Sequence, residues 1–388
     1  MEIQNINWNY PTPIWFGLNR SLEIASALKN LNITKPLVVT DPQFSENESF
    51  KKIMRNLSDA SIQFSIFTNL KGNPTGQNVS DGVKVFNSDL NDGVIAIGGG
   101  SALDAGKAIA LSTFRDPKSF WDLDMSNDID PITNSEKFSP LICIPTTAGT
   151  GAEVEPGAIV TKTQTKQKLV IFHPMFSPSA AILDPELILS LPKNLTASTG
   201  IDALVHAIEA YSVPNFNPIC DGIALQALRL MAPAIKQSYR NGADLSARGA
   251  MLAGSCMAAI SFNKGLGLVH SISHMVGGLY DTPHGLTNAI ILPAVLKYNK
   301  PKLEIKIKQI ASACGAKTED FNGLMEWIYE LYDEFKIPKS LGAIGVRKQD
   351  IVKLTEMILD DICLPTNPRP ITKASLETLL SKAIVKTW

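Results

Sequence analysis

The chain has 388 residues, which at about 150 residues per domain suggests two domains as the first expectation. Hydrophobic residues make up 45% and charged residues 19%, so each domain can bury a sizeable core. The 36 basic and 37 acidic side chains leave a formal net charge of -1, which argues against a nucleic-acid or anionic-membrane partner. No apolar run comes near the roughly 20 residues that a membrane-spanning helix needs.

The N-terminus and the cysteines indicate the expected compartment. The opening sequence MEIQNINWNYP has neither basic residues nor an apolar stretch, so we expect a cytoplasmic protein rather than a secreted one. The five cysteines are scattered without a CxxC pair, which excludes the usual thiolate metal site and the redox-active dithiol. Apolar surroundings such as LICIP fit buried, reduced thiols.

The first half of the chain alternates apolar runs with helical patterns. The helical patterns include residues 22–31 and 79–90, and strand–helix alternation of this kind predicts a parallel sheet covered on both faces. The runs are four to six apolar residues long, end in turn residues, and predict buried strands at residues 36–41, 61–67, 92–100, 140–147 and 180–184.

The second half changes character at Asn194. From there apolar residues recur at helical spacing, as in IDALVHAIEAY, and no strong strand signal follows Leu191. We therefore predict an α/β domain over residues 1–193 and an all-α domain over residues 194–388.

A glycine turn links a buried strand to a helix in GVIAI-GGGS-ALDAGKAIAL, residues 93–111. Backbone N–H groups at such a helix start suit a pyrophosphate, and the alternative is a tight turn without a ligand. The consecutive glycines do not fit GxGxxG. Lys107 does not fit a P-loop either, because Ser101 replaces its first glycine and Ala108 its hydroxyl residue.

Asp41 ends the first predicted strand, at the sheet edge where open α/β folds bind ligands. Its carboxylate could accept both adenosine ribose hydroxyls and would repel a 2′-phosphate. It precedes the glycine turn, however, which is not the usual Rossmann order. A turn or helix-capping aspartate before Pro42 is the alternative.

Four of the five histidines lie close together in the helical half. Asp202 and His206 are four residues apart and share one helix face, as do His270 and His274, while His284 follows in the loop TPHG. One carboxylate and three imidazoles suit a divalent metal such as Fe(II) or Zn(II). Spacing leaves open whether His274 or His284 is the additional histidine. The remaining histidine, in FHPMF, is expected to be structural.

At these residues the sequence resembles the iron-containing (group III) alcohol dehydrogenases, most closely the lactaldehyde reductase/1,2-propanediol oxidoreductase type. The resemblance covers nearly the whole chain and includes one departure, since FGLN at residues 16–19 replaces the common FGxG. Its motifs, in order, are GNPT (72–75), GGGSALDAGKA (98–108), IPTTAGTGAE (144–153), GIDALVHAIEAY (200–211), GLGLVHSISHMVGGLYDTPHG (265–285) and NPR (367–369).

The resemblance implies a dehydroquinate synthase-like fold, with a Rossmann-like dinucleotide domain followed by a helical metal- and substrate-binding domain. It implies that His274 is a non-ligand histidine near the nicotinamide and that Asp41 binds the ribose of NAD. The implied metal ligands are Asp202, His206, His270 and His284. The implied cofactor residues besides Asp41 are Gly98, Gly99, Gly100 and Ser101 at the pyrophosphate, and Thr146, Thr147 and Lys168 along the groove.

We therefore expect an NAD-dependent, metal-dependent alcohol dehydrogenase that interconverts small primary alcohols or diols and their aldehydes. Fe(II) is the expected metal, with Zn(II) as the alternative, and His274 is the candidate for proton relay or nicotinamide placement. The resemblance also suggests a homo-oligomer, a dimer or larger. The alternatives are a metal-dependent hydrolase or lyase on the same fold, and a non-catalytic nucleotide-binding relative.

Overall fold

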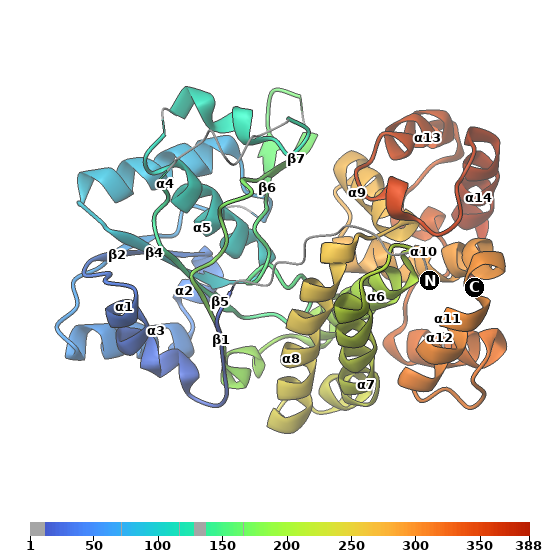
Figure 1. Cartoon of the computed structure of the whole chain (residues 1–388), viewed down its shortest axis with the longest axis horizontal. Helices are drawn as coiled ribbons and strands as arrows, with labels where there is room; N and C mark the ends of the chain where they lie inside the picture. Colours follow the sequence, from blue (N-terminus) through green and yellow to red (C-terminus); the bar gives the residue numbers. More distant parts are fainter. Residues whose placement is uncertain (1–11, 71, 116, 128–136, 166) are drawn as a thin grey trace. The chain divides into compact units, whose positions relative to one another are not determined.

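The computed structural model describes residues 12–70, 72–115, 117–127, 137–165 and 167–388, so the N-terminal sequence considered above lies outside the described residues (Figure 1). The chain forms two compact units. One, the α/β unit, extends to Thr147 and includes Gly151–Leu189, and the other, the helical unit, contains Ala148–Thr150 and Ser190–Trp388.

A parallel sheet of six strands forms the centre of the α/β unit, as predicted. Its order is β1-β8-β5-β4-β2-β3, so the strand order reverses between β2 and β4. The strands are β1 (Ile14–Phe16), β2 (Pro36–Thr40), β3 (Ser65–Phe67), β4 (Gly93–Gly98), β5 (Leu141–Pro145) and β8 (Ala180–Leu183).

Helices cover both faces of this sheet because its central strands are apolar on both sides. In β2, Val38 belongs to the core beneath α1 and α3, while its neighbours Leu37 and Val39 belong to the core beneath α4 and α5. The helices of this unit are α1 (Ile24–Asn30), α2 (Pro42–Ser45), α3 (Glu48–Asp59), α4 (Gly76–Ser88) and α5 (Gly100–Ser112), with 3₁₀ turns at Arg20–Glu23, Pro117–Leu123 and Pro185–Ile188.

An antiparallel ribbon in the α/β unit was not among the predicted strands. It pairs β6 (Ala158–Lys162) with β7 (Gln167–Ile171), apart from the main sheet. Ala158 and Val160 are buried while Ile159 between them is exposed, which is the alternation of a strand with one solvated face. The three-residue edge strand β1 was also missed.

The helical unit is all-α over its described residues, which confirms that prediction, and α7 and α8 run side by side within it (Figure 1). Its helices are α6 (Lys193–Ser212), α7 (Pro218–Arg240), α8 (Leu245–Ser261), α9 (Leu268–Tyr280), α10 (His284–Asn299), α11 (Glu304–Ala313), α12 (Phe321–Phe335), α13 (Ile351–Leu359) and α14 (Lys373–Val385). Its 3₁₀ turns are Phe262–Lys264, Lys300–Lys302, Leu341–Ile344, Lys348–Asp350 and Leu364–Thr366.

One helical segment differs from the expectation that no apolar run is long enough to span a membrane. The segment Leu245–Lys264 is long and apolar enough for a span by length and composition, with a mean hydropathy of 1.2. Its most apolar window is 61% buried inside the structure, and it contains buried Arg248, whose guanidinium donates to Thr196 Oγ1 and the Leu191 carbonyl. These features are those of a core helix that packs against α7.

All five cysteines are buried, and none forms a disulfide within the described part of the chain. Burial raises the pKa of the Cys143 and Cys363 thiols above their ordinary value and that of Cys314 to about 12. These thiols are therefore in their neutral form near pH 7, as expected for structural residues.

Candidate metal centre and dinucleotide edge

Three helices of the helical unit bring four of the predicted residues together. Helix α6 provides Asp202 and His206 on one face, α9 provides His270, and α10 begins at His284. One ligand atom from each lies within 4.8 Å of all the others. Asp202 Oδ1 is 3.9 Å from the Nε2 atoms of His206 and His270 and 3.6 Å from that of His284.

Hydrogen bonds at the opposite ring nitrogen orient two of these imidazoles. His270 Nδ1 lies 2.6 Å from Glu209 Oε2, and Ser273 Oγ lies 3.1 Å from His284 Nδ1. Both Nε2 atoms therefore face Asp202. The Nδ2 atom of Asn288 lies among these groups, 2.6 Å from Asp202 Oδ1, 3.3 Å from His270 Nε2 and 3.1 Å from His284 Nε2.

Burial favours the neutral form of the His206 and His270 imidazoles. It lowers the pKa of His206, against the opposing effect of Asp202, and it lowers that of His270 well below the ordinary value, together with the neighbouring histidines. Burial also raises the pKa of the Glu209 carboxyl to about 8, while the N–H groups of Val269 and His270 lower it. Neutral imidazoles present the lone pairs that a metal requires.

The chemistry of this donor set fits a divalent metal. Three imidazole nitrogens and one carboxylate oxygen converge, and the Asn288 amide is a hydrogen-bond donor directed at three of these four groups. Buried acceptors without a cation or donors between them would be costly. Mixed nitrogen and oxygen ligands of this kind suit Fe(II) or Zn(II) better than Mg(II) or Ca(II).

His274 lies beside this cluster but outside it. Its ring stacks on that of His284, with centroids 5.6 Å apart, and its Nδ1 is 2.9 Å from Asp361 Oδ2. Burial opposes ionisation of Asp361, but the hydrogen bond and charge of His274 hold the pKa of this carboxyl below its ordinary value. His274, Asp361 and Cys363 also form a close group, in which the Cys363 amide donates to Asp361.

In the α/β unit, the predicted cofactor residues other than Lys168 gather where the strand order reverses. Asp41 follows β2 and Gly98 ends β4, and these two strands are hydrogen-bonded neighbours. The Thr146 amide donates to the Gly98 carbonyl at 2.9 Å, so the residues after β5 join the same edge. Open α/β sheets bind ligands at the carboxyl ends of strands at such a switch point.

The glycine turn is close to Asp41. Gly98 has a φ of 150°, and a Cβ there would lie 2.6 Å from Ala102 Cβ and 3.3 Å from Asp41 Oδ2. Both interpretations of Asp41 fit, because its Oδ1 caps α2 by accepting from the Phe44 amide at 2.8 Å while Oδ2 faces the turn. Helix α5 starts at Gly100, and the Ser101 hydroxyl donates to the Gly72 carbonyl.

Lys168 lies apart from the turn, exposed on β7. Its register partner in the ribbon is Thr161, whose amide donates to the Pro74 carbonyl at 2.7 Å. The GNPT segment therefore contacts both Ser101 and the ribbon that carries Lys168. The histidine of FHPMF, His173, is buried in the α/β unit and accepts from the Met175 amide, as expected for a structural residue.

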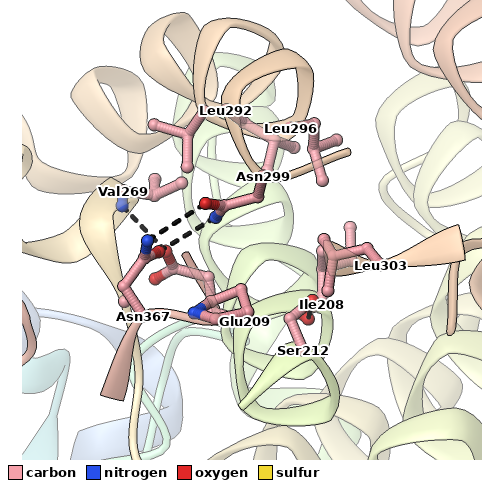
Figure 2. A pocket seen from close by; sticks show the side chains of 12 residues that line it. Ile208, Glu209, Ser212, Val269, Leu292, Leu296, Asn299, Leu303 and Asn367 are labelled. Carbon is pink, nitrogen blue, oxygen red and sulfur yellow. Dashed lines mark hydrogen bonds between the residues drawn. The ribbon is translucent and has the colours of Figure 1, made fainter. Parts of the chain in front are cut away.

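The sequence did not predict the carboxyl groups that hydrogen-bond to the histidines, those of Glu209 and Asp361. Glu209 lies seven residues after Asp202 on the same buried face of α6, and that periodicity was a usable signal. Asp361 is distant in sequence from its partner and carried none. Asn367, from the NPR motif, lines a cavity of about 10 Å³ with Glu209 and Asn299, room for about one water and too small for a substrate (Figure 2).

Two family models match the chain. One described as "Iron-containing alcohol dehydrogenase" matches residues 11–185, and one described as "Fe-containing alcohol dehydrogenase family, C-terminal" matches residues 196–384. Together they cover most of both units.

Curated relatives match over nearly the full length. The NAD-dependent methanol dehydrogenase of Bacillus methanolicus is 33% identical, over 97% of this chain and 100% of the relative. The 1,3-propanediol dehydrogenase of Citrobacter freundii is 34% identical, over 99% and 100%. The lactaldehyde reductase of Escherichia coli (strain K12) is 35% identical, over 95% and 97%.

Solved structures agree with the fold. A 1,3-propanediol oxidoreductase superposes with a TM-score of 0.90 at 33% identity, over 98% of this chain and 100% of that one. The sulfoacetaldehyde reductase from Bifidobacterium kashiwanohense, in complex with NAD+, has a TM-score of 0.89 at 27% identity, over 98% and 99%.

The fold and these matches define an oxidoreductase that acts on CH–OH groups. The chain belongs to the iron-containing alcohol dehydrogenase family, as the resemblance implied. None of the relatives described here favours the alternatives of a hydrolase, a lyase or a non-catalytic protein.

Proposed function

We propose that this protein is an NAD-dependent, Fe(II)-dependent alcohol dehydrogenase and aldehyde reductase for small primary alcohols or diols. The observation that carries the proposal is the convergence of Asp202, His206, His270 and His284 in one group, of which the first three are buried. When bound, the metal would supply a Lewis acid for the substrate oxygen and NAD would supply the hydride acceptor. Zn(II) is the alternative metal for the same donors.

In this proposal the four ligands hold the metal and His274 serves the proton. The hydrogen bond to Asp361 occupies His274 Nδ1, so its Nε2 is the nitrogen left to exchange a proton with the alcohol or alkoxide oxygen. The side chain of His274 is 26% exposed, whereas that of His270 is 2% exposed. This difference in solvent access distinguishes His274 from His270, and the hydrogen bond to Asp361 distinguishes it from the proposed ligand His284.

The α/β unit, with a proposed domain boundary after residue 193, would bind the dinucleotide. Gly98, Gly99, Gly100 and Ser101 would hold the pyrophosphate at the start of α5, and Thr146, Thr147 and Lys168 would line the groove. The position of Asp41 Oδ2 beside the glycine turn supports its role at the adenosine ribose. Its negative charge would favour NAD over NADP.

We further propose that the enzyme is cytoplasmic and assembles as a homo-oligomer, a dimer or larger. The buried thiols, none in a disulfide within the described residues, are compatible with a reducing compartment. The oligomeric state rests on the family alone, and sedimentation of the purified chain tests it.

The proposal is tested by metal content and turnover together. The chain is stripped of metal, reloaded with Fe(II) or Zn(II), and assayed with a panel of small alcohols and aldehydes against NAD and NADP. His284→Ala should lose metal and activity in parallel, by at least about 10–100-fold in affinity. His274→Ala is the matched control and should keep its metal while turnover falls.

Full metal occupancy and near-normal turnover of His284→Ala would contradict the ligand set. Equal metal loss in the two variants would mean that His274 is a ligand as well. A loaded wild-type chain that oxidises no small alcohol with either cofactor would contradict the proposed reaction.

A further inference from the structure

The buried end of helix α9 is closed by side chains from other elements. The residue before this helix is Gly267, which offers no side chain to cap it. The amides of Val269 and His270 donate to Glu209 Oε1 at 2.7 Å and Oε2 at 3.3 Å, and the Leu268 amide donates to Asn367 Oδ1 at 3.2 Å. The first N–H groups of a helix lack partners within it, so a buried helix start needs such acceptors.

These acceptors are themselves held in place. Asn367 and Asn299 exchange two hydrogen bonds, of 2.9 and 3.0 Å, and Figure 2 shows this pair beside Glu209. All three side chains are buried, and the cavity they line holds about one water at most. A Cβ at Gly267 would lie 2.9 Å from Glu209 Oε1 and 3.0 Å from Asn367 Oδ1, so glycine allows this close approach.

The same carboxylate reaches the imidazole of His270. Its Oε2 is 2.6 Å from Nδ1, while Nε2 on the far side of the ring faces Asp202 and accepts from Asn288. A neutral imidazole carries one proton. With Nε2 as an acceptor, that proton is on Nδ1 and is donated to Glu209.

We propose that Glu209, supported by the Asn367–Asn299 pair, is a positioning residue that fixes the tautomer and orientation of His270 for metal binding. This inference rests on the proposed function and adds a role for residues outside the four ligands. It also gives the NPR motif a function, because Asn367 completes the helix start from which His270 projects. Carboxylates behind ligating histidines typically contribute 10–100-fold to metal affinity.

Glu209→Gln tests the chemistry at constant shape. Three N–H donors face the carboxylate, from the Val269 amide, the His270 amide and His270 Nδ1. A glutamine amide has one oxygen, so in either orientation its NH₂ group meets at least one of these donors. The imidazole would then turn or change tautomer, and metal affinity should fall.

The experiment measures Co(II) and Zn(II) affinity of the metal-free full chain by competition with a chelator. The expected result is a 10–100-fold weaker affinity for Glu209→Gln and a changed Co(II) visible spectrum. Asn367→Ala, which removes the acceptor of the Leu268 amide and the partner of Asn299 but leaves the Glu209 carboxyl in place, should weaken affinity by about threefold or more. Asp320→Ala is the matched control, because it removes the acceptor of the Gly323 amide at the start of α12 and should leave metal affinity unchanged.

A double-mutant comparison separates positioning from general destabilisation. Glu209→Gln should have no further effect on metal affinity in a His270→Ala background, whereas a structural role would add its loss there. If Glu209→Gln does not fold, Asn367→Ala carries the test alone. If both variants bind metal with wild-type affinity, the inference is overturned while the proposed function stands. This is the result expected if Glu209 acts in its neutral form. A wild-type chain that binds neither metal tightly would instead overturn the proposed function.

Discussion

Replacing Lys107 by Met should destabilise the α/β unit by about 3–5 kcal/mol above neutral pH, the usual cost of breaking a buried ion pair. Lys107 is 1% exposed in α5, and its Nζ lies 3.0 Å from Asp104 Oδ1. It also donates to the carbonyls of Glu155 and Gly157, just before strand β6. The residue that does not fit a P-loop is therefore a buried link between α5 and the β6–β7 ribbon.

The loss should depend on pH because burial raises the pKa of Asp104, of Glu153 to about 7 and of Glu155 to about 8, while Lys107 lowers all three. A carboxyl group whose pKa is raised by folding adds to stability at pH values below its pKa in the unfolded chain. This contribution is lost as the pH rises through its pKa in the folded chain. At about 1.4 kcal/mol per unit, the shift of Glu153 from 4.5 to about 7 corresponds to ~3 kcal/mol. The ammonium group of Lys107 is what favours the ionised form of all three carboxyls, so the variant should lose more at about pH 8.5 than at about pH 5.5.

Unfolding in urea is monitored by hydrogen exchange of peptides from α5 and β6, which measures the stability of the α/β unit separately from that of the helical unit. Lys84→Met is the matched control, because Lys84 pairs with Asp81 at 3.2 Å with its side chain 69% exposed, and its loss should be close to zero at both pH values. A loss of less than about 1 kcal/mol at both pH values would contradict a stabilising buried ion pair at Lys107. A loss that does not change with pH would refute the role assigned to the carboxylates.

Two further predictions concern the two halves of the proposed site. Asp41→Asn keeps an acceptor for the Phe44 amide but removes the charge, so its melting temperature should hold while kcat/KM with NADP rises relative to NAD by about tenfold, or about 1.4 kcal/mol. An unchanged ratio would leave Asp41 as a cap only. Asp361→Asn should lower kcat while the metal content stays intact. This fall in kcat should be smaller than that of His274→Ala, for which we expect about 10²-fold or more. A further loss when the two are combined would separate Asp361 from His274.

The sequence predicted the buried strands better than the exposed ones. Strands β2, β4 and β5 are buried along their whole length, so their apolar runs are continuous and easy to detect. Strand β1 has only three residues at the sheet edge, and β7 begins with exposed Gln167 and Lys168. Strand β1 pairs with β8, which is distant in sequence and so absent from local patterns, and the exposed start of β7 offers no apolar run.

For the site, helical spacing was informative within one helix and uninformative between helices. It placed Asp202 beside His206 because both lie on one face of α6. It could not connect Asp361 with His274, 87 residues away, or Glu209 with His270, 61 residues away. Such pairs form only when the helices pack, so their partners become visible in the structure alone.

The two histidines of HSISH show how position in the fold assigns roles that spacing leaves open. Both project from one face of α9, and each has its Nδ1 on a carboxylate, Glu209 for His270 and Asp361 for His274. The Nε2 of His270 faces Asp202 in the interior, where a neutral imidazole can serve as a ligand. His274 stacks on His284 and has 26% of its side chain exposed, which fits the proton exchange proposed for it. The same local motif can therefore serve both proposed roles, the metal ligand at buried His270 and the proton carrier at partly exposed His274.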